Sequence, residues 1–260
     1  MLNRILKGPD SRTQQLAIVI LASFAAFTTY FCMYGFRKAI SAGTFEGLMA
    51  FGISFKSAIV IAQVLGYMTS MFIGIRFISE ITPAKRGTYI LTLIGGAHLC
   101  LLLMALIPLP YNVLFLFLNG MCLGLIWGLV FSYIEGRKYT DLIALILSIN
   151  FIFSSGVVKT VGRISIESWG VSELMMPFVT GAIFLPLLFL SVYLLGKIPP
   201  PAETEKKERG ERIRLDKSQR KELIRLFLPG LTTIVLINLL LTILRDIKDN
   251  YAVEMLLVLE

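Results

Sequence analysis

Residues 16–36, LAIVILASFAAFTTYFCMYGF, form an unbroken apolar run of 21 residues. About 20 apolar residues in a helix are enough to cross the hydrocarbon core of a bilayer. The apolar region of a cleavable signal peptide is shorter, and no small-residue cleavage site follows this run. The run therefore predicts a transmembrane helix, and this helix ends in two cations, Arg37 and Lys38.

The rest of the chain has the same character. Hydrophobic residues make up 56% of the 260 residues and charged residues 16%, against roughly 25% charged in a soluble domain. The apolar runs are continuous rather than alternating, which favours helices over strands. We therefore expect an all-α polytopic membrane protein. Its seven predicted spans are residues 16–40, 56–79, 88–107, 111–133, 142–166, 174–196 and 223–245.

The cations are distributed unevenly between the links. Eighteen of the 25 Lys and Arg residues precede span 1 or lie around the links after spans 2, 4 and 6. The link after span 3 has none, and the link after span 5 carries only Glu167 and Glu173. The positive-inside rule then places the N-terminus and residues 197–222 in the cytoplasm, as in a multi-pass protein of the inner membrane. We expect a six-span bundle over residues 1–196, a charged linker over 197–222 and the start of a second bundle over 223–260.

Three of the remaining cations lie at a similar depth. Arg37, Lys159 and Arg245 each come near the outer end of a span that runs from inside to outside. Long cationic side chains can reach the outer headgroups by snorkelling, and this explanation stays open. Lys38 points about 100° away from Arg37 on a helix, so it is the better candidate for such an anchor.

The acidic residues offer few partners to these cations. No Asp or Glu lies inside the first six spans, and Asp249 follows Arg245 by four residues, so those two could pair on one helix face. Arg37 and Lys159 have no acidic partner in their own spans. Unpaired cations that face a cavity predict an anionic ligand, and the planar fork of arginine matches phosphate or carboxylate.

Two further patterns have a structural and a functional interpretation. Asn150, Ser154 and Lys159 lie near one face of span 5, which indicates a water-filled cavity or hydrogen bonds between helices. In span 4 the pattern G-x-x-x-G-x-x-x-G predicts close helix packing, with a substrate-lining face as the alternative. Its members are Gly120, Gly124 and Gly128.

Several kinds of chemistry find no support in the sequence. The three Cys residues and the single His98 all lie inside apolar runs, which favours packing over metal binding. No nucleophile with a base, no metal cluster and no phosphate-binding loop is recognisable, so we expect no enzyme, no catalytic residue, no metal and no cofactor. The net charge of +8 is explained by topology, so no nucleic-acid partner is expected.

Three stretches resemble transporters of the major facilitator superfamily. FTTYFCMYGFRK (27–38) and LLLTILRDIKDN (239–250) are similar to two spans of organophosphate:phosphate antiporters, each of which carries a phosphate-binding arginine. WGVSELMMPFVTGAIFLPLLF (169–189), followed by IPPPAETE (198–205), resembles the sixth span of that family and its exit. The antiporter similarity is distant, and the resemblance is closest to an uncharacterised bacterial group of facilitator-like proteins.

The resemblance implies a fold and a function. It implies the six-helix bundle of a facilitator fold plus a seventh span, and secondary transport of a small organic or phosphorylated anion by alternating access. The matching arginines are Arg37 and Arg245. With them, the candidate substrate-binding residues are Lys159, Asn150 and Tyr34. The alternative function is a membrane sensor of an anionic metabolite on the same scaffold, without transport.

The sequence also departs from the family pattern. Met71 stands where such antiporters often have a lysine, and the loop motif after span 2 survives only loosely. A complete facilitator has about twelve spans, so we expect this chain to be a fragment or a truncation. The expected partners are a small anion, the lipid bilayer and the missing half of the same chain, with a second copy of the chain as the second choice.

Overall fold

The fold is all-α and spans a membrane several times. The computed structural model describes residues 12–137, 139–199, 217–251 and 255. Within this part of the chain, seven helical segments are long and apolar enough to cross a bilayer, which confirms the predicted spans. They are Leu16–Arg37, Phe55–Gly74, Pro83–Leu106, Val113–Ile134, Thr140–Glu167, Met176–Gly196 and Arg225–Asn250.

Five of these spans are continuous helices and two are broken. The continuous helices are α2 (Arg12–Arg37), α3 (Phe55–Glu80), α4 (Arg86–Leu106), α9 (Met176–Gly196) and α11 (Lys217–Asn250). The fourth span consists of α5 (Val113–Leu123) and α6 (Ile126–Ile134), and the fifth of α7 (Thr140–Ser148) and α8 (Asn150–Glu167). The residues at the breaks, Gly124, Leu125 and Ile149, keep right-handed helical backbone angles.

Short elements connect the spans. The 3₁₀ helix η1 (Ala39–Ala42) follows α2, and η2 (Pro83–Lys85) precedes α4. Between α2 and α3, the strands β1 (Met49–Ala50) and β2 (Ile53–Ser54) pair antiparallel, with Ala50 opposite Ile53. Phe51 and Gly52 between the strands both have a positive φ, as the tightest hairpin turn requires.

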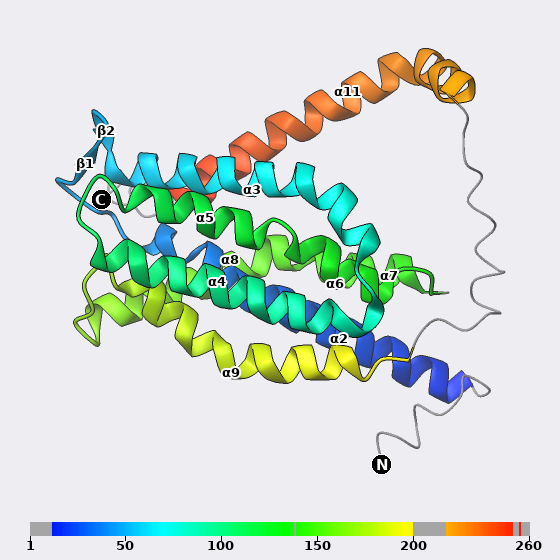
Figure 1. Cartoon of the computed structure of the whole chain (residues 1–260), viewed down its shortest axis with the longest axis horizontal. Helices are drawn as coiled ribbons and strands as arrows, with labels where there is room; N and C mark the ends of the chain where they lie inside the picture. The colour runs from blue at the N-terminus through cyan, green and yellow to red at the C-terminus, as the bar shows by residue number, and fades with distance from the viewer. Residues whose placement is uncertain (1–11, 138, 200–216, 252–254, 256–260) are drawn as a thin grey trace.

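The six spans from α2 to α9 pack as one bundle, and α11 lies beside it (Figure 1). The C-terminal end of α11 lies against the bundle, and its N-terminal end diverges from it (Figure 1). The described side chains from Leu226 to Leu241 are all exposed, whereas Asn250 is only 4% exposed. Helix α11 therefore docks on the bundle through its last turns.

Several predicted boundaries differ from the structure, and the seventh span, expected to end at residue 245, continues to Asn250. The first span was expected to continue to residue 40, but α2 ends at Arg37 and the chain continues as η1. Most of the predicted linker, residues 200–216, lies outside the described residues. Its last six residues already belong to α11, which begins at Lys217, because Lys, Arg, Gln and Glu are good helix formers outside the membrane as well.

The glycines of the fourth span bring α5 and α6 close to α3. A Cβ on Gly120 would lie 2.1 Å from the carbonyl oxygen of Gln63, and a Cβ on Gly124 would lie 2.7 Å from that of Tyr67. On α3, a Cβ on Gly66 would lie 1.9 Å from the carbonyl oxygen of Phe117. The backbones of the two spans are therefore in contact, and of the two interpretations of this glycine pattern the structure shows close packing.

Replacing Gly120 by alanine is expected to lower the free energy of unfolding by about 1–3 kcal/mol, because the added methyl group has no space beside α3. Gly95 is the matched control, since a Cβ there would have no neighbour within 4 Å. Thermal unfolding of the purified variants in detergent measures the difference. Equal unfolding temperatures for Gly120→Ala and Gly95→Ala would contradict the close contact.

The lone histidine packs inside the bundle. The ring of His98 stacks on Phe178, with 4.3 Å between centroids, and meets the edge of Phe36 at 5.3 Å. Cys32 and Cys100 are buried as well. The packing role predicted for these residues is confirmed.

Candidate anion-binding site

Charged residues gather where the C-terminal end of α11 meets the bundle. They come from the end of α2, from α8 and from α11, so three distant parts of the sequence contribute. We call this set the charged cluster. Its members are Arg37, Lys38, Ser155, Lys159, Arg245, Asp246, Asp249 and Asn250.

The carboxylate of Asp249 is the centre of this cluster. Its Oδ2 lies 3.0 Å from the Nζ of Lys38. Its Oδ1 accepts a hydrogen bond of 2.8 Å from the Nζ of Lys159 and a further one from the Oγ of Ser155. One carboxylate from α11 therefore joins the end of α2 to the middle of α8.

Lys38 is buried at this junction, with 6% of its surface exposed. Besides Asp249, its Nζ lies 3.7 Å from Asp246 and donates a hydrogen bond of 3.1 Å to the Oδ1 of Asn250. The same Asn250 oxygen accepts a bond of 2.9 Å from Ser41. The prediction that Lys38 is a snorkelling anchor is therefore wrong. It assumed that α2 continues past Lys38, whereas the helix ends at Arg37 and the chain turns inward.

Arg37 has an aromatic neighbour rather than an acidic one. Its guanidinium lies 4.1 Å from the centre of the Tyr67 ring of α3, a cation–π contact. Among the residues that the structure describes, no carboxylate lies within 4.0 Å of it. An aromatic ring does not neutralise a guanidinium, and Asp246 acts on Arg37 only from beyond 4.0 Å, so this positive charge is left largely uncompensated.

Arg245 is placed in a similar way on α11. Its guanidinium lies 5.6 Å from the centre of the Phe151 ring of α8 and 3.9 Å from the Oδ1 of Asp246, and about half of its side chain is exposed. The predicted pairing of Arg245 with Asp249 is wrong, because the Asp249 carboxylate faces the bundle and is held by Lys38 and Lys159.

Aromatic side chains surround the two arginines. Tyr34 is buried, lies edge-on to Tyr30 at 5.6 Å and is within electrostatic range of both Arg37 and Arg245. Tyr30 in turn meets Trp127 at 4.9 Å, and Trp127 stacks on Phe151 at 5.1 Å. The candidate residues Arg37, Arg245 and Tyr34 thus lie together.

Lys159 and Asn150 occupy different surroundings. Lys159 joins the cluster through Asp249. Asn150 is fully buried and donates to the carbonyl oxygens of Phe27, at 3.2 Å, and Leu147, and its own oxygen accepts from Ser154 at 2.6 Å. The structure thus shows helix-to-helix hydrogen bonding by Asn150, and a direct contact with substrate stays a prediction.

The net charge of the cluster is positive. It contains four cations, Arg37, Lys38, Lys159 and Arg245, and two carboxylates, Asp246 and Asp249. The carboxylates are used mainly by the two lysines, which leaves the two arginines as the source of the excess. Such an excess of guanidinium groups favours an anion with several oxygen atoms.

This fold and this cluster define a class, a multi-pass α-helical membrane protein with a cationic site between a six-helix bundle and a seventh span. The chain belongs to the family described as "Family of unknown function (DUF5690)", which matches it over residues 39–260. No curated protein and no solved structure matches it.

Proposed function

We propose that this protein is a secondary transporter of a small organic or phosphorylated anion, built on the major facilitator fold and working by alternating access. The observation that carries the proposal is the pair of arginines from α2 and α11. Each lies on an aromatic ring, both are within electrostatic range of Tyr34, and their only carboxylate contact among the described residues is 3.9 Å long.

The cost of these charges in a membrane supports an anionic ligand. A cation near the centre of a transmembrane helix costs about 2.5–3.5 kcal/mol on insertion scales. An oxyanion between Arg37 and Arg245 would offset this cost for both, and two guanidinium forks supply enough donors for a phosphate or a carboxylate. Lys159 lies in the same cluster, but its charge is paired with Asp249, so its contribution to an anion is smaller than that of the arginines.

The attachment of α11 supports movement between two parts. The six-helix bundle supplies Arg37 and α11 supplies Arg245, so a bound anion would contact both parts at once. By the distribution of cations, the N-terminus and residues 197–222 lie in the cytoplasm and the charged cluster lies towards the outer face of the inner membrane. In this orientation α11 is attached at the outer side and diverges at the inner side (Figure 1), as in a transporter that opens inward.

Uptake into proteoliposomes that contain the full-length protein tests the proposal. Vesicles preloaded with inorganic phosphate are offered labelled phosphate, glycerol 3-phosphate or succinate, and labelled glycerol serves as the uncharged control. We expect at least one anion to exchange and glycerol to stay outside. Binding of an anion without any flux would contradict transport and favour the sensor.

A further inference from the structure

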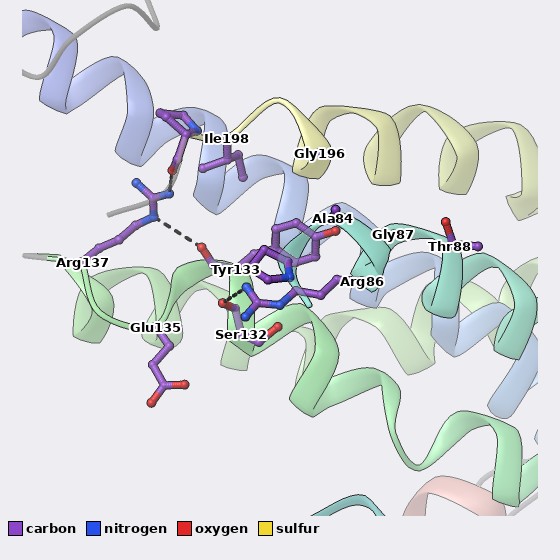
Figure 2. A pocket seen from close by; sticks show the side chains of 12 residues that line it. Ala84, Arg86, Gly87, Thr88, Ser132, Tyr133, Glu135, Arg137, Gly196 and Ile198 are labelled. Atoms are coloured by element: carbon purple, nitrogen blue, oxygen red, sulfur yellow. Dashed lines mark hydrogen bonds between the residues drawn. The ribbon is translucent and has the colours of Figure 1, made fainter. Parts of the chain in front are cut away.

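A cavity, seen from close by in Figure 2, lies at the start of α4, and the C-terminal end of α11 lies at the opposite end of the bundle (Figure 1). Its volume is about 800 Å³, and the start of α4, the end of α6 and the segment after α9 enclose it. This is the size range of ligand sites in proteins. The lining residues are Pro83, Ala84, Arg86, Gly87, Thr88, Ser132, Tyr133, Glu135, Arg137, Gly196, Ile198 and Pro199.

We propose that this cavity, which we call the α4–α9 pocket, binds a phosphate group, supplied by an anionic lipid headgroup or by a soluble phosphate. The proposal concerns binding alone and does not depend on transport through the charged cluster. Four observations carry it: the charge of Arg86, the position of Arg137, the direction of Glu135 and the first turn of α4.

Arg86 brings a positive charge without an acidic partner. Its Nη1 donates a hydrogen bond of 2.8 Å to the carbonyl oxygen of Ser132, and its guanidinium lies 5.8 Å from the centre of the Tyr133 ring. Both partners are neutral, and within the described part of the chain no carboxylate pairs with Arg86. A guanidinium has five N–H donors, so the bond to Ser132 leaves others for a ligand.

Arg137 lies on the other side of the pocket, and its side chain is held by the backbone. Its Nε donates to the carbonyl oxygen of Tyr133 at 3.4 Å, and its Nη2 donates to that of Pro199. Figure 2 shows Arg86 and Arg137 reaching residues 132 and 133 from different directions, while the Glu135 carboxylate points away from both guanidinium groups. Among the described residues, the lining therefore includes two guanidinium groups, and the Glu135 carboxylate does not face them.

The first turn of α4 adds to the positive potential. Gly87 and Thr88 lie in this turn and line the pocket. The start of a helix carries a partial positive charge that favours phosphate. Here the contribution is one of potential alone, because the backbone N–H of Arg86 already donates to the carbonyl oxygen of Pro83, and that of Gly87 is bonded to Tyr133. In this pocket the positive potential of the helix start adds to that of Arg86 and Arg137.

The topology of the chain does not account for this pocket. The positive-inside rule explains why cations occur in these links, but a cation that only sets topology needs no cavity and no fixed geometry. Arg137 is only 6% exposed, and Arg86 is half-buried. The apolar members Pro83, Ala84 and Ile198 suit the part of a ligand next to its phosphate, as in a phospholipid headgroup near the membrane surface.

Two probes distinguish the two sources of phosphate. Native mass spectrometry of the full chain, released from nanodiscs of phosphatidylcholine with phosphatidylglycerol, counts bound anionic lipid. Titration calorimetry with inorganic phosphate measures binding of the soluble ligand. It is done in an Arg37→Gln, Arg245→Gln background, so that both arginines of the charged cluster are absent. If only lipid is retained, the pocket is a headgroup site, and if only phosphate binds, its ligand is soluble. Either result supports the proposal, provided that the binding is lost in variants of the pocket.

The pocket variants are Arg86→Gln, which removes the uncompensated charge, and Ala84→Trp, which fills the cavity and keeps both arginines. Each should weaken binding of the active probe at least tenfold. The control is Lys197→Gln, because Lys197 is exposed and lies over the Tyr193 ring outside the pocket. If Arg86→Gln does not elute as a folded protein in size-exclusion chromatography, Ala84→Trp decides. The proposal is overturned if neither probe binds the parent protein. It is also overturned if every probe that binds the parent binds Ala84→Trp equally well.

Discussion

Replacing Arg37 by glutamine is expected to reduce the initial rate of anion uptake at least about 100-fold. A hydrogen bond to a charged group contributes about 1.5–3 kcal/mol, and a guanidinium can make two such bonds to one oxyanion. Loss of both bonds corresponds to two or more orders of magnitude. Glutamine keeps a polar group over the Tyr67 ring but removes the charge, so the helix should still insert. Labelled-anion uptake by proteoliposomes containing equal amounts of each protein measures the effect.

Arg245→Gln should cause a loss of similar size, because Arg245 is the corresponding cation on α11. Arg163→Gln is the matched control. Arg163 lies on α8, one turn beyond Lys159, but it pairs with Glu167 at 2.8 Å, outside the charged cluster. The rate of anion uptake by Arg163→Gln should equal that of the parent protein. Normal uptake by both the Arg37 and the Arg245 variant, at normal amounts in the membrane, would exclude binding of the transported anion between these two residues.

The transmembrane part of the fold could be predicted because the bilayer imposes it locally. Every backbone polar group in lipid must be hydrogen-bonded within the protein, which only helices and closed barrels achieve. A continuous apolar run such as residues 16–36 lacks the alternation of a barrel strand, so it predicts a helix. The close approach of α5 and α6 to α3 was predictable for a related reason, since glycines four residues apart form a flat face. Both inferences need only the spacing of residues along one segment.

The contacts of the charged cluster depend on information that one segment does not contain. The position of Lys38 is set by the end of α2, one residue earlier, where no proline signals it and the chain enters η1. The partner of Asp249 is set by the face of α11 that meets the bundle. Along α11 alone, Arg245 at a spacing of four residues was the available partner. Across helices, Lys38 and Lys159 are nearer.

The α4–α9 pocket was not predictable for the same reason. Arg86 and Arg137 belong to links separated by two spans, and in the sequence both count only as topological cations. They become parts of one lining because α4 and α6 pack side by side with the end of α9 next to them (Figure 2).

Replacing Asp249 by asparagine is expected to release α11 from the bundle and to lower stability by about 3–5 kcal/mol. Removing one partner of a buried ion pair leaves the other charge without compensation. Here two lysines lose their nearest carboxylate. Lys38 is the more costly of the two because it is almost fully buried and keeps only the more distant Asp246, at 3.7 Å. Asparagine has nearly the same shape as aspartate, so lost charge rather than lost packing causes the effect. Thermal unfolding in detergent and spin-label distances between α3 and α11 measure it.

Two further variants separate the role of this carboxylate from a general effect of charge. Asp246→Asn removes an acid with longer contacts, 3.7 Å to Lys38 and 3.9 Å to Arg245, and should cost less than about 1 kcal/mol. Adding Lys38→Met to Asp249→Asn removes the stranded charge and should restore part of the stability, which a double-mutant cycle reports as coupling between the two sites. If Asp249→Asn and Asp246→Asn unfold alike, and the Lys38 change adds without coupling, Asp249 does not hold α11 on the bundle. If the coupling is present, the carboxylate that neutralises the two lysines is also the contact that the proposed transport cycle would have to break. The two arginines beside it, which have no such partner, would then keep their charge for the proposed anion.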